Sequence, residues 1–511
     1  MAGETIIRGR WVIPGAGEDD KAISDGAVVV RGDRVVETGD RATLTAKYPD
    51  AARLGSDDVA VMPGLINAHH HSWAATPIQH ARPDQQLEPW ILSGKRNRQS
   101  DDHLDTLLAA ARQMAGGVTS VVDAYFGGGT AKNYSDAVDA GIRAYETAGM
   151  RVAFSTGVDT QSFIVWGKGE DERFIASLPE ELRAGTREFL PAPGDITGDE
   201  YLDIIESYKR KYEAHPRIDV WFGPGGPHWM PDDLLARVAE RAEAIDTRIQ
   251  THCVETIYEK MHGYRFYGKP TMLHLRDLGF LSPRLSVAHG IWMTEAEMDA
   301  VAAAGVAVSH NPSSNLRLRA GIAPVLYFRE RGVPVAIGMD GFAINDDEDM
   351  FSEIRLAWRL NGTPPLDGPG LTPRDALAMA TIEGARLMGK GKEVGRLAPG
   401  CLADLILVDL KRITTPWVAP EVDPLQLLVY RARLGDVSTV MVGGDVVFRD
   451  GRPVHFDVDA VIREVAAIFD GQPFRAERAA LVERLHPILR AWYLGWDMPE
   501  PKPWMAYNSR Q

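Results

Sequence analysis

The sequence predicts an α/β protein, in which a (β/α)8, TIM-like barrel carries a small β-sandwich domain built from both ends of the chain. Three observations predict this fold. Short β-branched runs alternate with helical patterns through the middle of the chain, as in βα units that form a parallel sheet. Strand-like segments separated by turn residues occur at both ends. Histidines and an aspartate stand at the ends of several predicted strands, where such a barrel gathers its functional side chains.

The first sixty residues read as short strands with turns between them, for example 6–13, 26–31 and 34–39. The segments 395–409 and 438–448 have the same character. We therefore expect one β-sandwich domain assembled from residues 1–58 and 392–455.

Eight candidate strands follow in the region 59–391, with helical stretches such as 232–244 and 295–304 between them. These eight units predict the barrel. The strands are 61–68, 118–124, 151–156, 218–223, 248–252, 285–289, 306–310 and 333–339.

Two segments exceed what a plain barrel needs. The interval 159–213 is longer than a usual βα connection, and it can be either a lid over a pocket or a packed surface insertion. The tail, 456–511, reads as a helical, aromatic-rich C-terminal extension. Aromatic residues near a chain terminus more often anchor a tail or a subunit contact than bind substrate. They are Trp492, Tyr493, Trp496, Trp504 and Tyr507.

Composition excludes several classes of protein. The 511 residues carry a formal charge of −15 without a dense Lys/Arg run, which disfavours nucleic-acid binding. Only Cys253 and Cys401 occur, so a disulfide scaffold is excluded and a reducing, cytoplasmic setting fits. We see neither a secretory signal nor an apolar stretch of the ~18 residues that a membrane span needs. We expect a homo-oligomer, a dimer or larger.

Three stations along the chain carry metal-ligand residues: Asn-Ala-His-His-His at 67–71, Thr-His-Cys-Val-Glu at 251–255 and Gly-Met-Asp-Gly at 338–341. They close the first, fifth and eighth predicted strands. Because alternate strand residues share a side, His69 and His71 can face the barrel mouth while His70 points away.

Imidazoles with one carboxylate suit a borderline divalent metal such as Zn²⁺, with Fe²⁺ or Mn²⁺ as alternatives. Water on such a metal has its pKa lowered towards ~7, which provides hydroxide at neutral pH. Glu255, three residues after His252, is suited to shuttle the proton to a leaving group, although a solvent-exposed loop carboxylate is the plainer interpretation. His289, at the end of the sixth strand, can bond the water or the substrate. Asp340 can bind the metal and also accept a proton.

Signatures of other enzymes are absent from the sequence. There is no His-Glu-x-x-His of zinc proteases, no Gly-x-Ser-x-Gly elbow and no Walker loop. The His-x-Glu and Pro-Cys-x-x-Cys pair of the small zinc deaminases is also missing.

From about residue 5 to about residue 455, the chain resembles the amidohydrolase superfamily, in the cytosine-deaminase-like and chlorohydrolase branch. That branch includes adenosylhomocysteine deaminases, guanine-type deaminases and triazine hydrolases. The motifs that carry the resemblance are 63–71, 252–255, 288–290, 309–315 with 321–325, 340–341 with 345–346 and 349–350, and 399–405.

The resemblance implies one divalent metal per chain, held by His69, His71, His252 and Asp340. The fourth strand, with Trp221-Phe222-Gly223-Pro224, offers no lysine to bridge two metals. The resemblance also implies catalytic roles for Glu255, His289 and Asp340. We assign substrate contacts to His228, Trp90 and Asn315.

One position departs from the branch. Many of its deaminases carry a substrate-binding histidine after strand four in a Gly-Pro-His context, where this chain has Gly225, and His228 comes three residues later. The glycine should leave volume that aromatics of 159–213 can line. We therefore expect a flatter, more apolar substrate than a purine nucleoside.

The site predicts a metal-dependent hydrolase acting on a small molecule. The first hypothesis is deamination of an aromatic or heterocyclic amine by a metal-bound hydroxide. The alternative is hydrolysis of a urea, carbamate, amide or halogenated ring (C–N or C–Cl) by the same site. A catalytically silent scaffold is a third hypothesis, but such a protein should lose ligands, and this chain keeps all of them.

Overall fold

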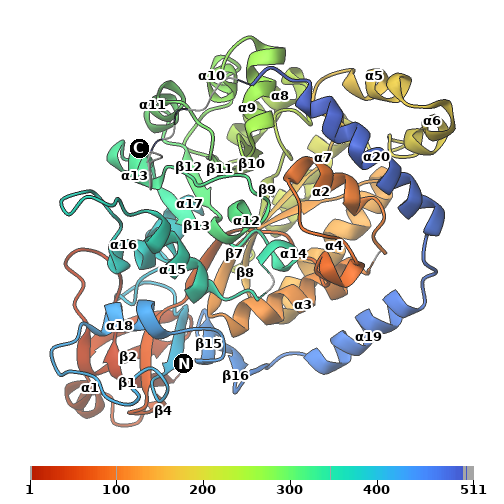
Figure 1. Cartoon of the computed structure of the whole chain (residues 1–511). Coiled ribbons are helices and arrows are strands. Elements are labelled where there is room, and N and C mark those ends of the chain that lie inside the picture. The colour runs from red at the N-terminus through yellow and green to blue at the C-terminus, as the bar shows by residue number, and fades with distance from the viewer. Residues whose placement is uncertain (1–2, 99, 346, 499–501, 503, 505–511) are drawn as a thin grey trace.

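A computed structural model describes residues 3–98, 100–345, 347–498, 502 and 504. Its centre is a sheet of eight parallel strands in the order β13-β12-β11-β10-β9-β8-β7-β6, with helices around it (Figure 1). The strands are β6 (Leu65–His70), β7 (Val118–Phe126), β8 (Arg151–Gly157), β9 (Ile218–Phe222), β10 (Ile249–Cys253), β11 (Leu285–His289), β12 (Ala307–His310) and β13 (Val335–Ile337). The predicted (β/α)8 barrel is confirmed.

The first and last strands of the barrel meet at the candidate metal site. The backbone N–H groups of Met339 and Asp340 both donate to the carbonyl of His69, at 3.2 and 2.9 Å. These bonds join the chain just after β13 to β6 and bring two of the three sequence stations together.

Strand residues alternate between the inside of the barrel and its helix-covered outside, as the pleat requires. Val121 and Phe154 pack in the large core beneath the helices, whereas Val122, Ala153 and Trp221 belong to a separate interior cluster. Small interior residues such as Ala153 leave room for the large indole ring of Trp221 on the neighbouring strand.

The first predicted barrel strand, 61–68, differs from the structure. Residues Val59–Pro63 form β5, which pairs with the second sheet, and the barrel begins only at Leu65. Gly64 separates the two strands, and a Cβ there would lie 2.1 Å from Thr119 Oγ1. The chain thus crosses between sheets where only glycine fits.

The second sheet joins both ends of the chain. Its strands are β1 (Glu4–Val12), β2 (Ile23–Arg31), β3 (Arg34–Asp40), β4 (Ala52–Gly55), β5, β14 (Leu405–Asp409), β15 (Val437–Val442), β16 (Asp445–Arg449) and β17 (Arg452–Pro453). Antiparallel pairing of β5 with β14 makes the link between the N-terminal and C-terminal strands. We propose the domain limits that the sequence predicts, which are 1–58 with 392–455 for the β-sandwich domain, 59–391 for the barrel and 456–511 for the extension.

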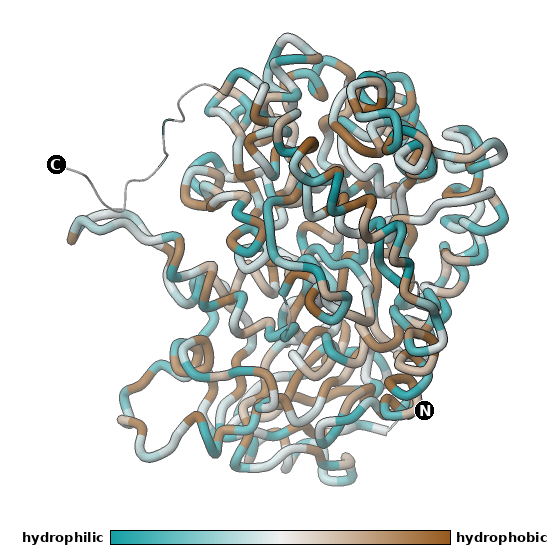
Figure 2. Tube along the Cα trace, turned by 45° about the vertical axis from the view of Figure 1, so that its right-hand side comes forward, coloured by the Kyte–Doolittle hydropathy of each residue, from teal (hydrophilic) through white to brown (hydrophobic). Residues whose placement is uncertain are grey.

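Helices flank the barrel strands, and side chains often fix their ends. Helix α11 begins after Thr294, whose hydroxyl and Glu297 form a capping box. The barrel helices are α3 (Asp102–Ala115), α4 (Ala131–Ala148), α7 (Gly198–Tyr212), α8 (Asp232–Ala244), α9 (Ile257–His262), α10 (Thr271–Asp277), α11 (Glu295–Ala303), α12 (Pro312–Arg317), α13 (Val325–Glu330), α14 (Phe342–Asn345), α15 (Met350–Leu360), α16 (Pro373–Met379) and α17 (Ile382–Leu387). Helix α1 (Arg41–Lys47) packs on the second sheet, whereas α18 (Pro424–Arg431) contacts the barrel helices α15 and α16. Figure 2 shows hydrophobic and hydrophilic residues alternating along the outer helices.

The interval 159–213 holds α5 (Glu170–Ser177) and α6 (Glu180–Arg187) ahead of the barrel helix α7. The C-terminal extension holds α19 (Val458–Asp470) and α20 (Ala476–Leu494), and α20 lies beside α6 and α2 (Leu87–Gly94) in Figure 1. An apolar cluster, the tail cluster, unites these elements. It contains Leu92, Trp166, Phe174, Leu182, Phe189, Val482, Leu485, Leu489, Tyr493 and Trp496 among its buried residues.

The hydroxyl of Tyr493 accepts the backbone N–H of Trp166 at 3.0 Å, so the tail also bonds the insertion. Of the two interpretations of 159–213, the structure therefore favours a packed insertion.

Trp504 contacts Tyr327, while Tyr507 and Asp346 lie outside the described residues. In the part of the chain that the structure describes, no helix has the length and apolar character to cross a membrane.

Candidate metal centre

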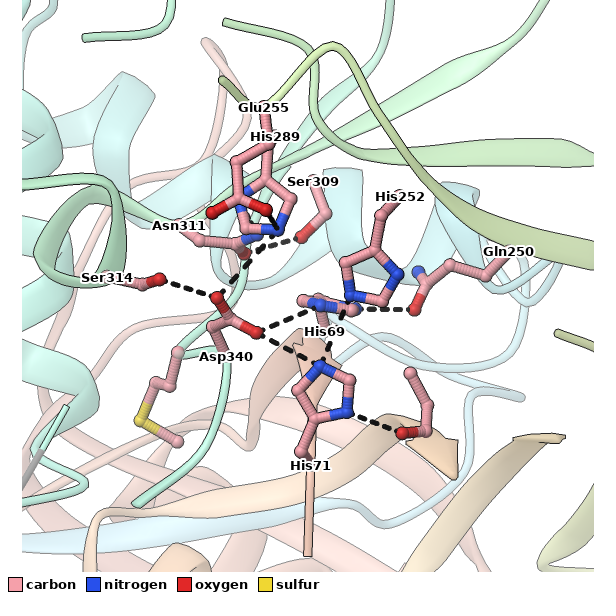
Figure 3. Close-up of polar contacts among 12 residues, drawn as sticks. His69, His71, Gln250, His252, Glu255, His289, Ser309, Asn311, Ser314 and Asp340 are labelled. Atoms are coloured by element: carbon pink, nitrogen blue, oxygen red, sulfur yellow. Dashed lines mark hydrogen bonds and ion pairs between the residues drawn. The ribbon is translucent and has the colours of Figure 1, made fainter. Parts of the chain in front are cut away.

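The four residues predicted to bind metal come together at the carboxyl end of the barrel (Figure 3). His69 lies at the end of β6 with His71 just beyond it, His252 is the last residue but one of β10, and Asp340 follows β13. All four are buried. Asp340 Oδ1 lies 3.1 Å from His69 Nε2 and 3.2 Å from His71 Nε2, and His71 Nε2 lies 3.2 Å from His252 Nε2.

Each of the three imidazoles gives its Nδ1–H to an oxygen that can only accept. His69 bonds Gln250 Oε1 at 2.8 Å, His71 bonds the Ala124 carbonyl at 2.5 Å, and His252 bonds the Gly225 carbonyl at 2.8 Å. Burial, together with the surrounding imidazoles, lowers the pKa of His252 well below its usual range. Its ring is therefore neutral.

This arrangement leaves the lone pairs of three Nε2 atoms facing one another and a carboxylate. Without a cation between them, two Nε2 acceptors 3.2 Å apart repel. Oriented neutral imidazoles with second bonds to carbonyl oxygens are typical of metal ligands. The residues present thus fit a divalent cation.

Asp340 is held from a second side. Ser314 Oγ donates to Asp340 Oδ2 at 2.5 Å, and the Asp340 backbone lies in the left-handed region with φ of 60°. Burial by itself raises the pKa of Asp340, whereas positive charge on the side of His69 and His71, from an Nε2–H or from a cation in its place, holds that pKa well below its usual range. The residue is therefore an anion.

His289 offers an alternative fourth ligand. One nitrogen or oxygen from each of His69, His252, His289 and Asp340 lies within 4.8 Å of the others. His289 Nε2, however, is 3.8 Å from Asp340 Oδ2, whereas His71 Nε2 is 3.2 Å from both His252 and Asp340. The shorter distances favour the predicted ligand, His71.

Glu255 and His289 lie next to the four ligands and near each other. Glu255 Oε2 is 3.5 Å from His289 Nε2, and among the described residues neither Glu255 Oε1 nor His289 Nε2 has a hydrogen-bond partner. Burial, and then the charges of Glu259, Asp340 and Glu88, raise the pKa of Glu255 well above its usual range. The solvent-exposed alternative for Glu255 is wrong, because the residue is 3% exposed.

The chain bends sharply between His252 and Glu255. Val254 has a φ of 48°, which is a rare conformation for a β-branched residue. The Val254 carbonyl accepts the N–H of Trp292 at 3.0 Å, and the N–H of Glu255 donates to Glu259 Oε2 at 3.0 Å. These bonds hold the turn that aims Glu255 at the site.

His70 points away from the ligands, as strand alternation predicts. Its Nε2 lies 3.1 Å from Glu348 Oε1, and the coulombic attraction of that carboxylate raises the pKa of His70 against the opposing effect of burial. His70 therefore has a partner that links β6 to the segment before α15.

The three predicted substrate residues occupy different places. Asn315 accepts the Nδ1–H of His289 at 2.9 Å, so it orients that ring. Trp90 lies 6.1 Å from Trp73, ring to ring, and Trp73 stacks on His71 at 5.1 Å. His228 is packed between the rings of Trp166 and Trp229, at 4.5 and 4.2 Å, rather than among the ligands.

Several residues next to the site were missed in the sequence. Trp73, Phe126 and Trp229 surround the rings of His71 and His252, while Gln250 and Ser314 orient ligands. Strand alternation could have identified Gln250, which lies two residues before His252 and therefore on the same side. Nothing local marks Ser314 or Trp229.

The expectation that Gly225 leaves volume is wrong. A Cβ on Gly225 would lie 2.8 Å from Asp159 Oδ1, 3.0 Å from Trp229 Cε3 and 3.2 Å from Phe126 Cε1. The space of the absent side chain is filled by neighbours, one of which carries a charge.

Comparison with known proteins gives consistent matches. Residues 60–447 match the Amidohydrolase family, and residues 26–51 match the Imidazolonepropionase-like composite domain of bacteria. The 5-methylthioadenosine/S-adenosylhomocysteine deaminase of Nitratidesulfovibrio vulgaris is 31% identical over 448 residues, which cover 87% of this chain and 92% of the relative. The 5'-deoxyadenosine deaminase of Methanosarcina mazei is 31% identical, with 90% and 96% covered.

Solved structures resemble the chain along nearly its whole length. An adenosine deaminase from Xanthomonas campestris with bound zinc has a TM-score of 0.76 at 26% identity, covering 92% of this chain and 98% of that one. Atrazine chlorohydrolase from Arthrobacter aurescens TC1, complexed with zinc, has a TM-score of 0.73 at 23% identity, covering 91% and 100%. The second likeness concerns the fold alone.

Proposed function

The chain belongs to the amidohydrolase family, and we propose that it deaminates an aromatic or heterocyclic amine with release of ammonia. One observation carries the proposal: three imidazoles and one carboxylate converge beside the buried carboxyl group of Glu255, whose Oε1 has no hydrogen-bond partner among the described residues. The imidazoles and the Asp340 carboxylate are suited to hold a metal that activates water. Glu255 is suited to move the proton of that water.

We assign His69, His71, His252 and Asp340 as the ligands of one divalent metal per chain. Zinc is the metal we propose, because imidazole nitrogens with one carboxylate suit it, and iron or manganese is the alternative. A divalent ion bound there would lower the pKa of coordinated water towards ~7 and polarise the substrate.

Glu255 would act as the proton carrier. Its carboxyl group is buried and its pKa is raised, so it can hold a proton at neutral pH and release it within the site. In hydrolysis of a ring amine, water adds its oxygen to the carbon, one proton passes through Glu255 to the amino nitrogen, and ammonia leaves as the carbon–nitrogen bond breaks.

His289 would position the reacting water or substrate. Burial lowers the pKa of His289 to about 4, and Asn315 accepts its Nδ1–H, so its Nε2 presents a lone pair towards Glu255 and Asp340. A lone pair at this point can accept a hydrogen bond from water and direct its oxygen at the substrate. Asp340 Oδ2, on the same side, is suited to receive a proton from that water.

Relatives support deamination over the alternative. Two similar proteins are named as deaminases of adenosine derivatives, and one is a chlorohydrolase of related fold. Glu255 is useful where a leaving nitrogen needs a proton, which chloride does not. Hydrolysis of a urea, carbamate, amide or halogenated ring by the same groups is the second candidate.

We further propose that the protein works in the cytoplasm on a small molecule, as a homo-oligomer. Both cysteines are free thiols, which fits a reducing compartment. Large apolar residues such as Trp417 and Leu366 are exposed, which is consistent with a contact between subunits. Trp90 and His228 are retained as proposed substrate contacts alongside Asn315. Sedimentation velocity would give the oligomer size.

A panel of heterocyclic amines, aryl ureas and chlorotriazines tests the proposal with the metal-loaded protein. Ammonia release from ring amines, with little chloride or urea cleavage, is the expected result. Chloride release in preference to ammonia would make the second candidate the function.

A further inference from the structure

Asp159 lies where the side chain of residue 225 would begin. Its Oδ1 is 2.8 Å from the position of a Cβ on Gly225, closer than the rings of Trp229 and Phe126. Gly225 in turn holds a proposed ligand, since its carbonyl accepts both the Nδ1–H of His252, at 2.8 Å, and the backbone N–H of His252, at 3.1 Å. The carboxylate of Asp159 therefore contacts the residue, Gly225, that bonds the proposed ligand His252.

Backbone bonds fix Asp159 in this place. The N–H groups of Thr160 and Gln161 both donate to the carbonyl of Trp229, at 3.0 and 3.1 Å. The side chain of Gln161 donates to the carbonyls of His228 and Met230, at 3.2 and 3.0 Å. The end of β8 is thus bonded to the segment after β9, and the carboxylate does not depend on a mobile loop for its position.

Asp159 has no partner for its charge. Among the described residues no donor hydrogen-bonds its carboxylate and no cation lies within ion-pair distance, although Lys95 is near enough to lower its pKa. The residue is exposed, yet surrounding protein raises its pKa to about 6. Asp159 therefore reaches solvent while one of its carboxylate oxygens points at the Gly225 position.

Aromatic rings lie beside Asp159 at the Gly225 position. Phe126 and Trp229 both approach the Gly225 position, and the Phe126 ring lies 5.4 Å from His71 and 5.5 Å from His252. Flat rings beside an unpaired carboxylate suit a flat ligand that carries a positive charge or an N–H donor.

We propose that Asp159 is a specificity-determining residue that binds a cationic or N–H-donating substituent of the substrate. The substrate class is then a ring amine carrying a second, protonated amino group. The ring would lie against Phe126 and Trp229, the amine to be hydrolysed would face Glu255, and the charged group would bond Asp159. This inference rests on the proposed function for the identity of the ligand as substrate, but its test does not require turnover.

Binding of benzylammonium and of benzyl alcohol, followed by tryptophan fluorescence at pH 8 on the metal-loaded protein, separates charge recognition from shape. The wild type should bind the cation roughly tenfold or more tightly than the alcohol, as a charge-assisted hydrogen bond allows. Asp159→Asn should reduce the preference to about threefold or less without changing alcohol binding or metal content. Asp159→Ser should behave likewise, and Asp159→Glu should keep part of the preference.

Asp233→Asn is the matched control, because Asp233 is exposed at the start of α8 and is not among the nearest neighbours of the Gly225 position. It should bind both probes like the wild type. The inference is overturned if Asp159→Asn keeps the preference for benzylammonium over benzyl alcohol, as it would if the amine simply bound the metal. It is also overturned if the wild type shows no such preference. Failure of the proposed function would appear separately, as an absence of ammonia release by a protein that still binds the cation through Asp159.

Discussion

The Nε2 atoms of His71 and His252 lie 3.2 Å apart, and each ring has already given its Nδ1–H to a backbone carbonyl. Two lone pairs therefore point at each other inside the protein. Burial lowers the pKa of His252 well below its usual range, and a cation between the two rings would satisfy both lone pairs.

Replacing His252 with Ala should remove most of the bound metal and with it the activity, because one of four ligands is lost. Elemental analysis of purified protein would measure the metal. His455→Ala provides the control, since His455 lies on the surface beside Asp445 and should keep metal and activity. Full metal occupancy in the His252 variant would remove it from the ligand set.

Replacing Glu255 with Gln should leave metal content nearly intact and reduce turnover by roughly 10²-fold or more, as expected when a general acid/base is lost. The amide keeps the size of the side chain but cannot carry the proton. Loss of metal in this variant would make Glu255 a ligand, and unchanged turnover would show that it takes no part.

Much of this site could be predicted because it depends on strand ends. A parallel barrel brings all strand C-termini to one face, so His69, His252 and Asp340 converge once their strands are recognised. Alternation separates His70 from His69 and His71 in the same way. The position of β5 could not be predicted, because an apolar strand at 59–63 fits either sheet and its pairing with β1 and β14 decides.

The surroundings of Gly225 could not be predicted for a different reason. Absence of a side chain at one position gives no information on which distant side chain fills the space. Asp159 and Trp229 approach through bonds between two loops, and the pattern of either loop alone does not predict that contact.

Purine nucleosides should be poor substrates, because Gly225 offers no imidazole and a carboxylate stands in its place. Adenosylhomocysteine, methylthioadenosine and guanine can be assayed beside triazines, pterins and aryl ureas. A kcat/KM above roughly 10⁴ M⁻¹s⁻¹ for a nucleoside would show that another group, such as His228, performs the role.

Truncation of a buried residue in the tail cluster should destabilise the protein. Leu489 is fully buried in α20, and Leu489→Ala should cost about 2–5 kcal/mol and lower the Tm. Leu494→Ala, at the end of the same helix and 72% exposed, is the control and should leave the Tm nearly unchanged. Equal Tm values for both variants would mean that α20 does not contribute to the folded core.

The metal content of the purified wild-type protein tests the metal-centre assignment most directly. With His69, His71, His252 and Asp340 as ligands, we expect about one divalent metal per chain, removed by chelation together with activity and restored by zinc. Two metals per chain with a bridging ligand from β9, or full activity in metal-free protein, would contradict it.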